Sequence, residues 1–162
     1  SASSLIARFN NIVVLKTLSK AWGLAGARVG FMIADPAIIT LMQTVRAPYP
    51  ISATTARATE IVFNATGEAT MRQSVADIIR ERERLAVSLK KLSCVSEVVP
   101  SQANFLVARF KNKDAALGAL RAEGIITRDR SSELGLSDGV RITVGLPEEN
   151  TRLLKVLETI NG

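Results

Sequence analysis

The sequence has 162 residues, of which 47% are hydrophobic and 22% charged, so a packed core of one ordinary domain or two small ones is expected. The lack of histidine and the single cysteine, Cys94, exclude an internal disulfide, a zinc site built from Cys and His, and a Ser-His-Asp catalytic site. No apolar run approaches the ~20 residues of a membrane span, so we expect a cytoplasmic protein with no membrane partner.

The net charge of +6 comes from basic residues scattered along the chain, with twice as many arginines as lysines. A single Trp and a single Tyr cannot form an aromatic platform for stacking bases. Arginine binds carboxylates and phosphates in a bidentate manner. The composition therefore favours an anionic small molecule as partner over nucleic acid, and we expect no metal.

The first fifty residues predict two strands, at 11–17 and 29–34, and a helix at 36–45 that begins at an Asp-Pro pair. Two prolines in 46–51 predict an extended loop and a candidate domain boundary. Two strands and one helix are too few for a sheet domain. The chain is therefore expected to be a fragment of a longer protein.

Two helices are expected next, at 52–64 and 68–93. The second carries apolar residues at steps of three and four, namely Met71, Val75, Ile78, Leu85, Leu89 and Leu92. Arg82 interrupts this stripe, and the charges alternate in sign over 80–84, which is typical of a solvated helix face. Part of this helix is therefore expected to face water.

The remainder alternates between short strands and helices. The pattern predicts strands at 95–99, 104–110, 125–128 and 140–144, a helix at 113–123 ended by Gly124, and a final helix opened by Pro147. This order predicts a small sheet with helices packed on it. Cys94, at the end of a helical stretch, is expected to be a core residue.

The residues with the clearest chemistry follow the first strand. Thr17 and Ser19 supply hydroxyls beside Lys20, and Arg28 lies eight residues further on, among glycines that allow close approach or positive φ. Hydroxyls and a guanidinium suit a phosphate dianion. A lysine near a cation and partly desolvated becomes a usable amine, able to form a Schiff base with an aldehyde.

The stretch from Thr17 to Phe31, TLSKAWGLAGARVGF, resembles the cofactor-lysine segment of the fold-type I aminotransferases. Within that family the chain looks most like the histidinol-phosphate aminotransferase branch. The resemblance continues in order through the whole chain, in segments at 47–50, 101–105, 128–129 and 141–145. It implies an α/β fold, with residues 1–50 forming the incomplete end of the large cofactor domain and residues 51–162 the small C-terminal α+β domain.

The resemblance also implies a cofactor, pyridoxal 5′-phosphate, and roles for particular residues. Lys20 would form the covalent link with the cofactor and then move a proton between the substrate's α-carbon and the cofactor. Thr17, Ser19 and Arg28 would hold the cofactor phosphate, and Arg141 the substrate α-carboxylate.

Other implied substrate contacts are less specific. Asn104, Arg128 and Arg152 match positions near the substrate, where an arginine could meet its phosphate. For Arg128, which is next to Asp129 and Arg130, a structural ion pair is an equal alternative. Tyr49 matches a family loop, and a packing role at the hinge is an equal alternative.

The activity implied is transamination between glutamate and a phosphorylated substrate in histidine biosynthesis, by a homodimer. The aspartate and tyrosine that the family uses around the cofactor ring have no counterpart before Lys20, so this chain alone is expected to bind the cofactor weakly. An aromatic aminotransferase or a threonine-phosphate decarboxylase would share the lysine segment. A non-catalytic fragment or interaction domain is the alternative of another class.

Overall fold

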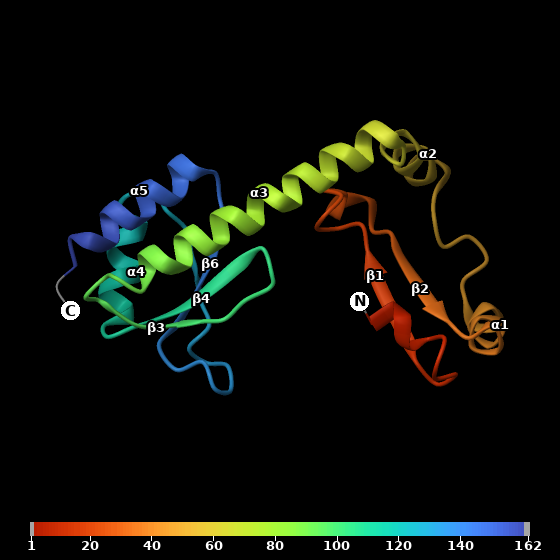
Figure 1. The fold of residues 1–162 in the computed structure, drawn as a ribbon, viewed down its shortest axis with the longest axis horizontal. Helices are drawn as coiled ribbons and strands as arrows, with labels where there is room; N and C mark the ends of the chain where they lie inside the picture. The colour runs from red at the N-terminus through yellow and green to blue at the C-terminus, as the bar shows by residue number, and fades with distance from the viewer. Residues whose placement is uncertain (1, 161–162) are drawn as a thin grey trace. The chain divides into compact units, whose positions relative to one another are not determined.

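A computed structural model describes residues 2–160 and divides the chain into two compact units, residues 1–74 and 75–162. A single helix, α3 (Ala65–Leu89), contributes to both. Each unit has its own sheet, shown in Figure 1. The family resemblance implies a domain boundary near residue 50. The division into compact units does not test that boundary, which stays a prediction.

The first unit is built on a two-stranded ribbon. Its regular elements are β1 (Val13–Thr17), β2 (Gly30–Ala34), α1 (Pro36–Val45) and α2 (Ala53–Val62). The strands are antiparallel, in register from Val13↔Ala34 to Thr17↔Gly30. The Asp35 side chain accepts from the N–H of Ala37 at 2.9 Å, which confirms the predicted start of α1.

The second unit is a four-stranded antiparallel sheet with helices on one face (Figure 1). Its elements after α3 are β3 (Val95–Val99), β4 (Phe105–Phe110), α4 (Lys113–Ala122), β5 (Arg128–Asp129), β6 (Gly139–Thr143) and α5 (Pro147–Glu158). The strand order is β3-β4-β6-β5. The predicted sheet with packed helices is thus confirmed.

The core lies between this sheet and the helices. Alternate residues of the two central strands point into it, so that Leu106, Ala108 and Phe110 of β4 and Val140 and Ile142 of β6 are buried. The helices add Leu85, Leu89, Ala116, Leu120, Leu153, Leu154 and Leu157. Cys94 is buried in the same cluster, as expected. The other sheet face does not belong to this core.

The charged stretch at 80–84 of α3 is solvated only in part: three of its five residues are exposed, as expected, whereas Glu81 and Arg82 are buried. Glu81 accepts hydrogen bonds from Arg84 and, at 3.0 Å, from the Asn150 side chain. These partners hold the pKa of Glu81 below its ordinary value. Arg82 donates to the Ala103 carbonyl at 3.2 Å. Partners distant in sequence thus make burial of both charges possible.

Two further expectations need correction. The strand predicted at 125–128 is reduced to Arg128–Asp129, since only these two residues pair with β6. Helix α3 ends at Leu89 rather than at 93. Gly124 does end the preceding helix region, with φ of 71°. Within residues 2–160, none of the helices has the combination of length and apolar character that crossing a bilayer requires.

The side chain of Asn150 links three parts of the second unit. Its amide donates to Glu81 and, at 2.9 Å, to the carbonyl of Gly145, and its oxygen accepts from the Gly145 N–H at 3.1 Å. We expect Asn150→Ala to lower the free energy of unfolding by about 2–3 kcal/mol, because buried polar groups lose their partners. Denaturant unfolding followed by circular dichroism measures this change.

The matched control is Lys155→Ala, on the exposed side of the same helix. It should change the free energy of unfolding by no more than about 0.5 kcal/mol. Equal effects of the two substitutions would contradict the role given to the Asn150 side chain.

Candidate functional site

Two buried side chains anchor the segment that carries Lys20. Leu18 and Val29 are 2% and 6% exposed, and the N–H of Leu18 donates to the Val29 carbonyl at 3.1 Å. Strand β1 pairs with β2 through its last residue, Thr17. The backbone at the start of the lysine segment therefore lies beside the backbone just before β2, where Arg28 is found. The side chains of Lys20 and Arg28 are both exposed.

The two hydroxyls of the segment bind each other. Thr17 Oγ1 donates to Ser19 Oγ at 2.8 Å and accepts from the Ser19 N–H at 3.1 Å. The Thr17 hydroxyl proton is thereby used, and the Ser19 proton remains for an outside acceptor. The two hydroxyls predicted to bind phosphate therefore lie within hydrogen-bonding distance of each other.

Arg28 adopts a backbone conformation that is unfavourable for a residue with a side chain. Its φ and ψ are 54° and 37°, in the left-handed region, which costs roughly 1–2 kcal/mol for a non-glycine residue. Its guanidinium donates to the Ala25 carbonyl at 3.3 Å, and among residues 2–160 it has no acidic partner. Strain of this kind is concentrated at functional sites.

The predicted uses of glycine in this segment are borne out at two positions. Gly23 has φ of 66°, and a Cβ at Gly30 would lie 3.0 Å from the carbonyl oxygen of Lys16. Gly26 shows neither property. The backbone of the segment therefore depends on glycine at its turn and at its entry into β2.

The groups present fit the phosphate of pyridoxal phosphate. Residues 17–30 contain two cations, two hydroxyl side chains and no acid, and the guanidinium of Arg28 is not used by a carboxylate. Such a donor set favours a phosphate dianion. Thr17, Ser19 and Arg28 would hold that phosphate, and the exposed Lys20 amine would react with the aldehyde. These assignments stay predictions.

The second unit places two arginines directly opposite one another. Arg128 of β5 pairs in register with Arg141 of β6, and both lie on the sheet face that is turned away from the core, since Val140 and Ile142 point to the helices. Like charges in this position destabilise a sheet. Among residues 2–160, neither arginine has an ion pair. An anion bound between the two guanidinium groups would offset their repulsion.

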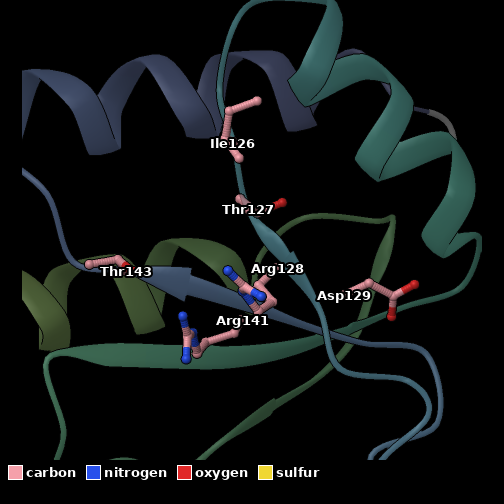
Figure 2. Close-up of a pocket in the computed structure, with 6 residues that line it drawn as sticks. All are labelled: Ile126, Thr127, Arg128, Asp129, Arg141 and Thr143. Atoms are coloured by element: carbon pink, nitrogen blue, oxygen red, sulfur yellow. The ribbon is translucent and has the colours of Figure 1, made fainter.

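These arginines line a cavity of about 400 Å³, together with Ile126, Thr127, Asp129 and Thr143. Figure 2 shows Arg128 and Arg141 close together, and Asp129 pointing away from them. Arg141 also lies over the ring of Phe105, with 5.3 Å from Cζ to the ring centroid, a contact that orients the guanidinium. The cavity therefore carries two positive charges, and the orientation of one of them, Arg141, is fixed by an aromatic ring.

The acids near Arg128 are engaged elsewhere, and among residues 2–160 the alternative of a structural ion pair for Arg128 is not borne out. The Asp129 carboxylate accepts from Lys113 Nζ at 2.8 Å and from Ser131, and these partners hold its pKa well below the ordinary value. Glu133 pairs with Arg130 at 2.7 Å. Arg128 keeps its charge available to a ligand.

Arg152 and Asn104 are not part of this cavity. Arg152, on α5, donates to the carbonyl of Glu123 and lies 3.5 Å from its carboxylate. The carbonyl of Asn104 accepts from the Val144 N–H at 3.0 Å, which ties its loop to the end of β6. Tyr49 is 94% exposed, so it does not pack in the described structure. The substrate roles of Arg152 and Asn104 stay predictions.

Sequence reasoning missed two threonines of the cavity. Thr143 lies two residues after Arg141, so strand alternation places both on one face, and this signal was available in the sequence. Thr127 Oγ1 is buried and, within the described part of the chain, has no hydrogen-bond partner. Only the structure shows that this residue lines the cavity.

Comparison with known proteins identifies a family to which the chain is similar. The family model described as "Aminotransferase class I and II" matches residues 2–157. A histidinol-phosphate aminotransferase of Xylella fastidiosa is 45% identical over 162 residues, which are 100% of this chain and 44% of that protein. The chain thus spans less than half the length of this relative.

Solved structures share the fold. A histidinol-phosphate aminotransferase from Clostridium acetobutylicum aligns with a TM-score of 0.86 and 23% identity, over 98% of this chain and 48% of that one. An L-threonine-O-3-phosphate decarboxylase from Porphyromonas gingivalis aligns with a TM-score of 0.80 and 26% identity, over 97% of this chain and 49% of that one.

The strain at Arg28 leads to a first prediction. We expect Arg28→Gly to raise the free energy of unfolding by about 1 kcal/mol, because glycine adopts the left-handed conformation without a steric cost. The same variant should bind inorganic phosphate more weakly. Thermal unfolding and a phosphate titration measure the two effects, and Arg46→Gly, in the loop after α1, is the control. A loss of stability in Arg28→Gly would contradict the reading of strain.

The opposed arginines lead to a second prediction. Arg128→Gln should raise the free energy of unfolding by about 0.2–1 kcal/mol at low ionic strength, because it removes a like-charge cross-strand pair. The gain should shrink in 1 M salt, where the Debye length is about 3 Å. Unfolding experiments at both salt concentrations check this, with exposed Arg121→Gln as control. A destabilised, salt-insensitive variant would show that the two charges do not repel.

Proposed function

The chain belongs to the class I and II aminotransferase family, and on that premise we propose that it forms part of a pyridoxal-phosphate enzyme of histidine biosynthesis. The proposed reaction is a reversible transfer of the amino group from glutamate to the keto compound imidazole-acetol phosphate, yielding 2-oxoglutarate and histidinol phosphate. The observation that carries the proposal is the acid-free segment around Lys20, with an exposed amine, a hydroxyl pair and a strained arginine.

The first unit would hold the cofactor. When bound, pyridoxal phosphate supplies an electron sink for negative charge on the substrate's α-carbon. Ser19 and Arg28 would bind its phosphate, with Thr17 orienting the Ser19 hydroxyl at 2.8 Å. Lys20 would anchor the cofactor covalently and, once displaced by substrate, its amine would move the proton at the α-carbon.

The second unit would bind the anionic ends of the substrate. Arg141, oriented by Phe105, suits the planar α-carboxylate, since a guanidinium binds it with two parallel hydrogen bonds. Arg128, opposite it, suits the substrate's phosphate. An anion between them also offsets their mutual repulsion. Asn104 and Arg152 are further candidate contacts, and for Arg152 this role would require its side chain to leave Glu123.

Assembly and location belong to the same proposal. The family resemblance supports a homodimer in the cytoplasm, with glutamate as amino donor. Apolar side chains of the first unit such as Leu15, Leu41 and Val45 are 66–76% exposed and would be available to further protein in such an assembly.

A second candidate reaction is decarboxylation of threonine phosphate, supported by the alignment with the decarboxylase at a TM-score of 0.80. Both reactions need the cofactor lysine and a site for a phosphorylated substrate. The aminotransferase is favoured, because the relative with that activity is 45% identical, against 26% for the decarboxylase.

Cofactor attachment tests the proposal directly. The chain is mixed with pyridoxal phosphate, reduced with borohydride and mapped by peptide mass spectrometry. We expect the label on Lys20, because its segment is the one suited to the cofactor phosphate, and loss of the label in Lys20→Ala. Lys16→Ala, four residues earlier and also exposed, is the matched control and should keep it.

The reaction is then assigned in a longer protein. The chain is joined to the N-terminal part of the Xylella fastidiosa relative, and the product is measured with each substrate. Glutamate formation from histidinol phosphate and 2-oxoglutarate supports transamination, whereas carbon dioxide from threonine phosphate supports the decarboxylase. A label spread evenly over the lysines, with neither product, would refute both.

A further inference from the structure

The strand that carries Arg128 is too short to fix its own orientation. Strand β5 has two residues, paired as Arg128↔Arg141 and Asp129↔Val140. Successive residues of a strand point to opposite faces, so a shift by one residue would exchange the positions of Arg128 and Asp129. That exchange would place a carboxylate opposite Arg141 and destroy the anion site.

A polar cluster outside the cavity opposes this shift. The Asp129 carboxylate accepts from Lys113 Nζ at 2.8 Å, from the Ser131 N–H at 2.8 Å and from the Ser131 hydroxyl at 2.6 Å. Lys113 also donates to the Ser131 hydroxyl at 3.2 Å. Both carboxylate oxygens of Asp129 thus accept hydrogen bonds, and Figure 2 shows the carboxylate pointing away from Arg141.

Lys113 ties this cluster to a rigid element. It is the first residue of helix α4, whose N-cap Asn112 accepts from the Ala115 N–H at 3.0 Å. The Lys113 side chain is 19% exposed, while that of neighbouring Asp114 is 88% exposed. The lysine is therefore held against the protein, with Asp129 as its nearest carboxylate, at 2.8 Å against 3.4 Å for Asp114.

We propose that Lys113 is a positioning residue for the substrate anion site, which it serves by holding Asp129 and thereby turning Arg128 toward Arg141. This inference rests on the proposed function, because it assumes that the arginine pair receives an anion of the substrate. Lys113 itself does not line the cavity. It acts also by neutralising the acid next to Arg128, which would otherwise compete for that guanidinium.

The test uses the whole 162-residue chain, labelled with ¹⁵N and titrated with inorganic phosphate. The probe signal is the Nε–Hε group of Arg128, assigned by its absence in Arg128→Gln. We expect saturable shifts in the wild-type chain. Lys113→Met should weaken phosphate binding on the order of threefold to tenfold, and Lys113→Arg should restore most of it. Lys111→Met, two residues away, removes the same charge and should leave the affinity near wild type.

A double-mutant cycle separates positioning from a general effect of charge or stability. In the Arg128→Gln background, where binding is followed at the Nε–Hε group of Arg141 in the same cavity, Lys113→Met should cause no further loss of phosphate affinity, because Lys113 acts through Arg128. An equal loss in both backgrounds, or wild-type affinity in Lys113→Met, would overturn the inference while leaving the anion site intact. Absence of any shift in the wild-type chain would overturn the anion site itself, and this inference with it.

Discussion

The alternation of side chains along β6 is the constraint on which the second unit depends. Val140 and Ile142 point toward the helices and are at most 1% exposed. Because successive residues of a strand alternate, Arg141 and Thr143 point to the opposite face. The same register brings Arg128 opposite Arg141. Core packing and the candidate anion site are therefore two consequences of one strand, and a shift of β6 by one residue would destroy both.

Two buried charged side chains of helix α3 form hydrogen bonds with other elements of this unit. Glu81 and Asn150 join helix α3 to the start of α5 and to the backbone of Gly145, just beyond β6. Arg82 joins α3 to the Ala103 carbonyl, in the loop before β4. Each charge is expensive to bury alone and acceptable with its partners. These partners fix the ends of the two strands that form the centre of the sheet.

Two unfavourable local features lie at residues to which function is assigned. Arg28 has a left-handed backbone, and the paired Arg128 and Arg141 repel one another. A fold optimised for stability alone would have glycine at the first position and a neutral residue in the pair. Both features have a use once an anion binds, since binding supplies the compensating interaction. This reasoning supports a phosphate site in the first unit and a substrate-anion site in the second.

The sequence by itself determined the local features. Asp35 and Pro36 begin a helix, Gly124 ends one, Pro147 opens the last, and the segment around Lys20 carries its chemistry within fourteen residues, because capping, turns and short motifs depend on neighbours in the chain. Tertiary structure alone decided which charges are buried and which stay available. Asp129 is bound by Lys113, sixteen residues away, rather than by adjacent Arg128, and Glu81 is bound by Asn150, sixty-nine residues away. Electrostatic partners depend on distances in space. Those distances are set only when the strands pair in one register and the helices pack on the sheet.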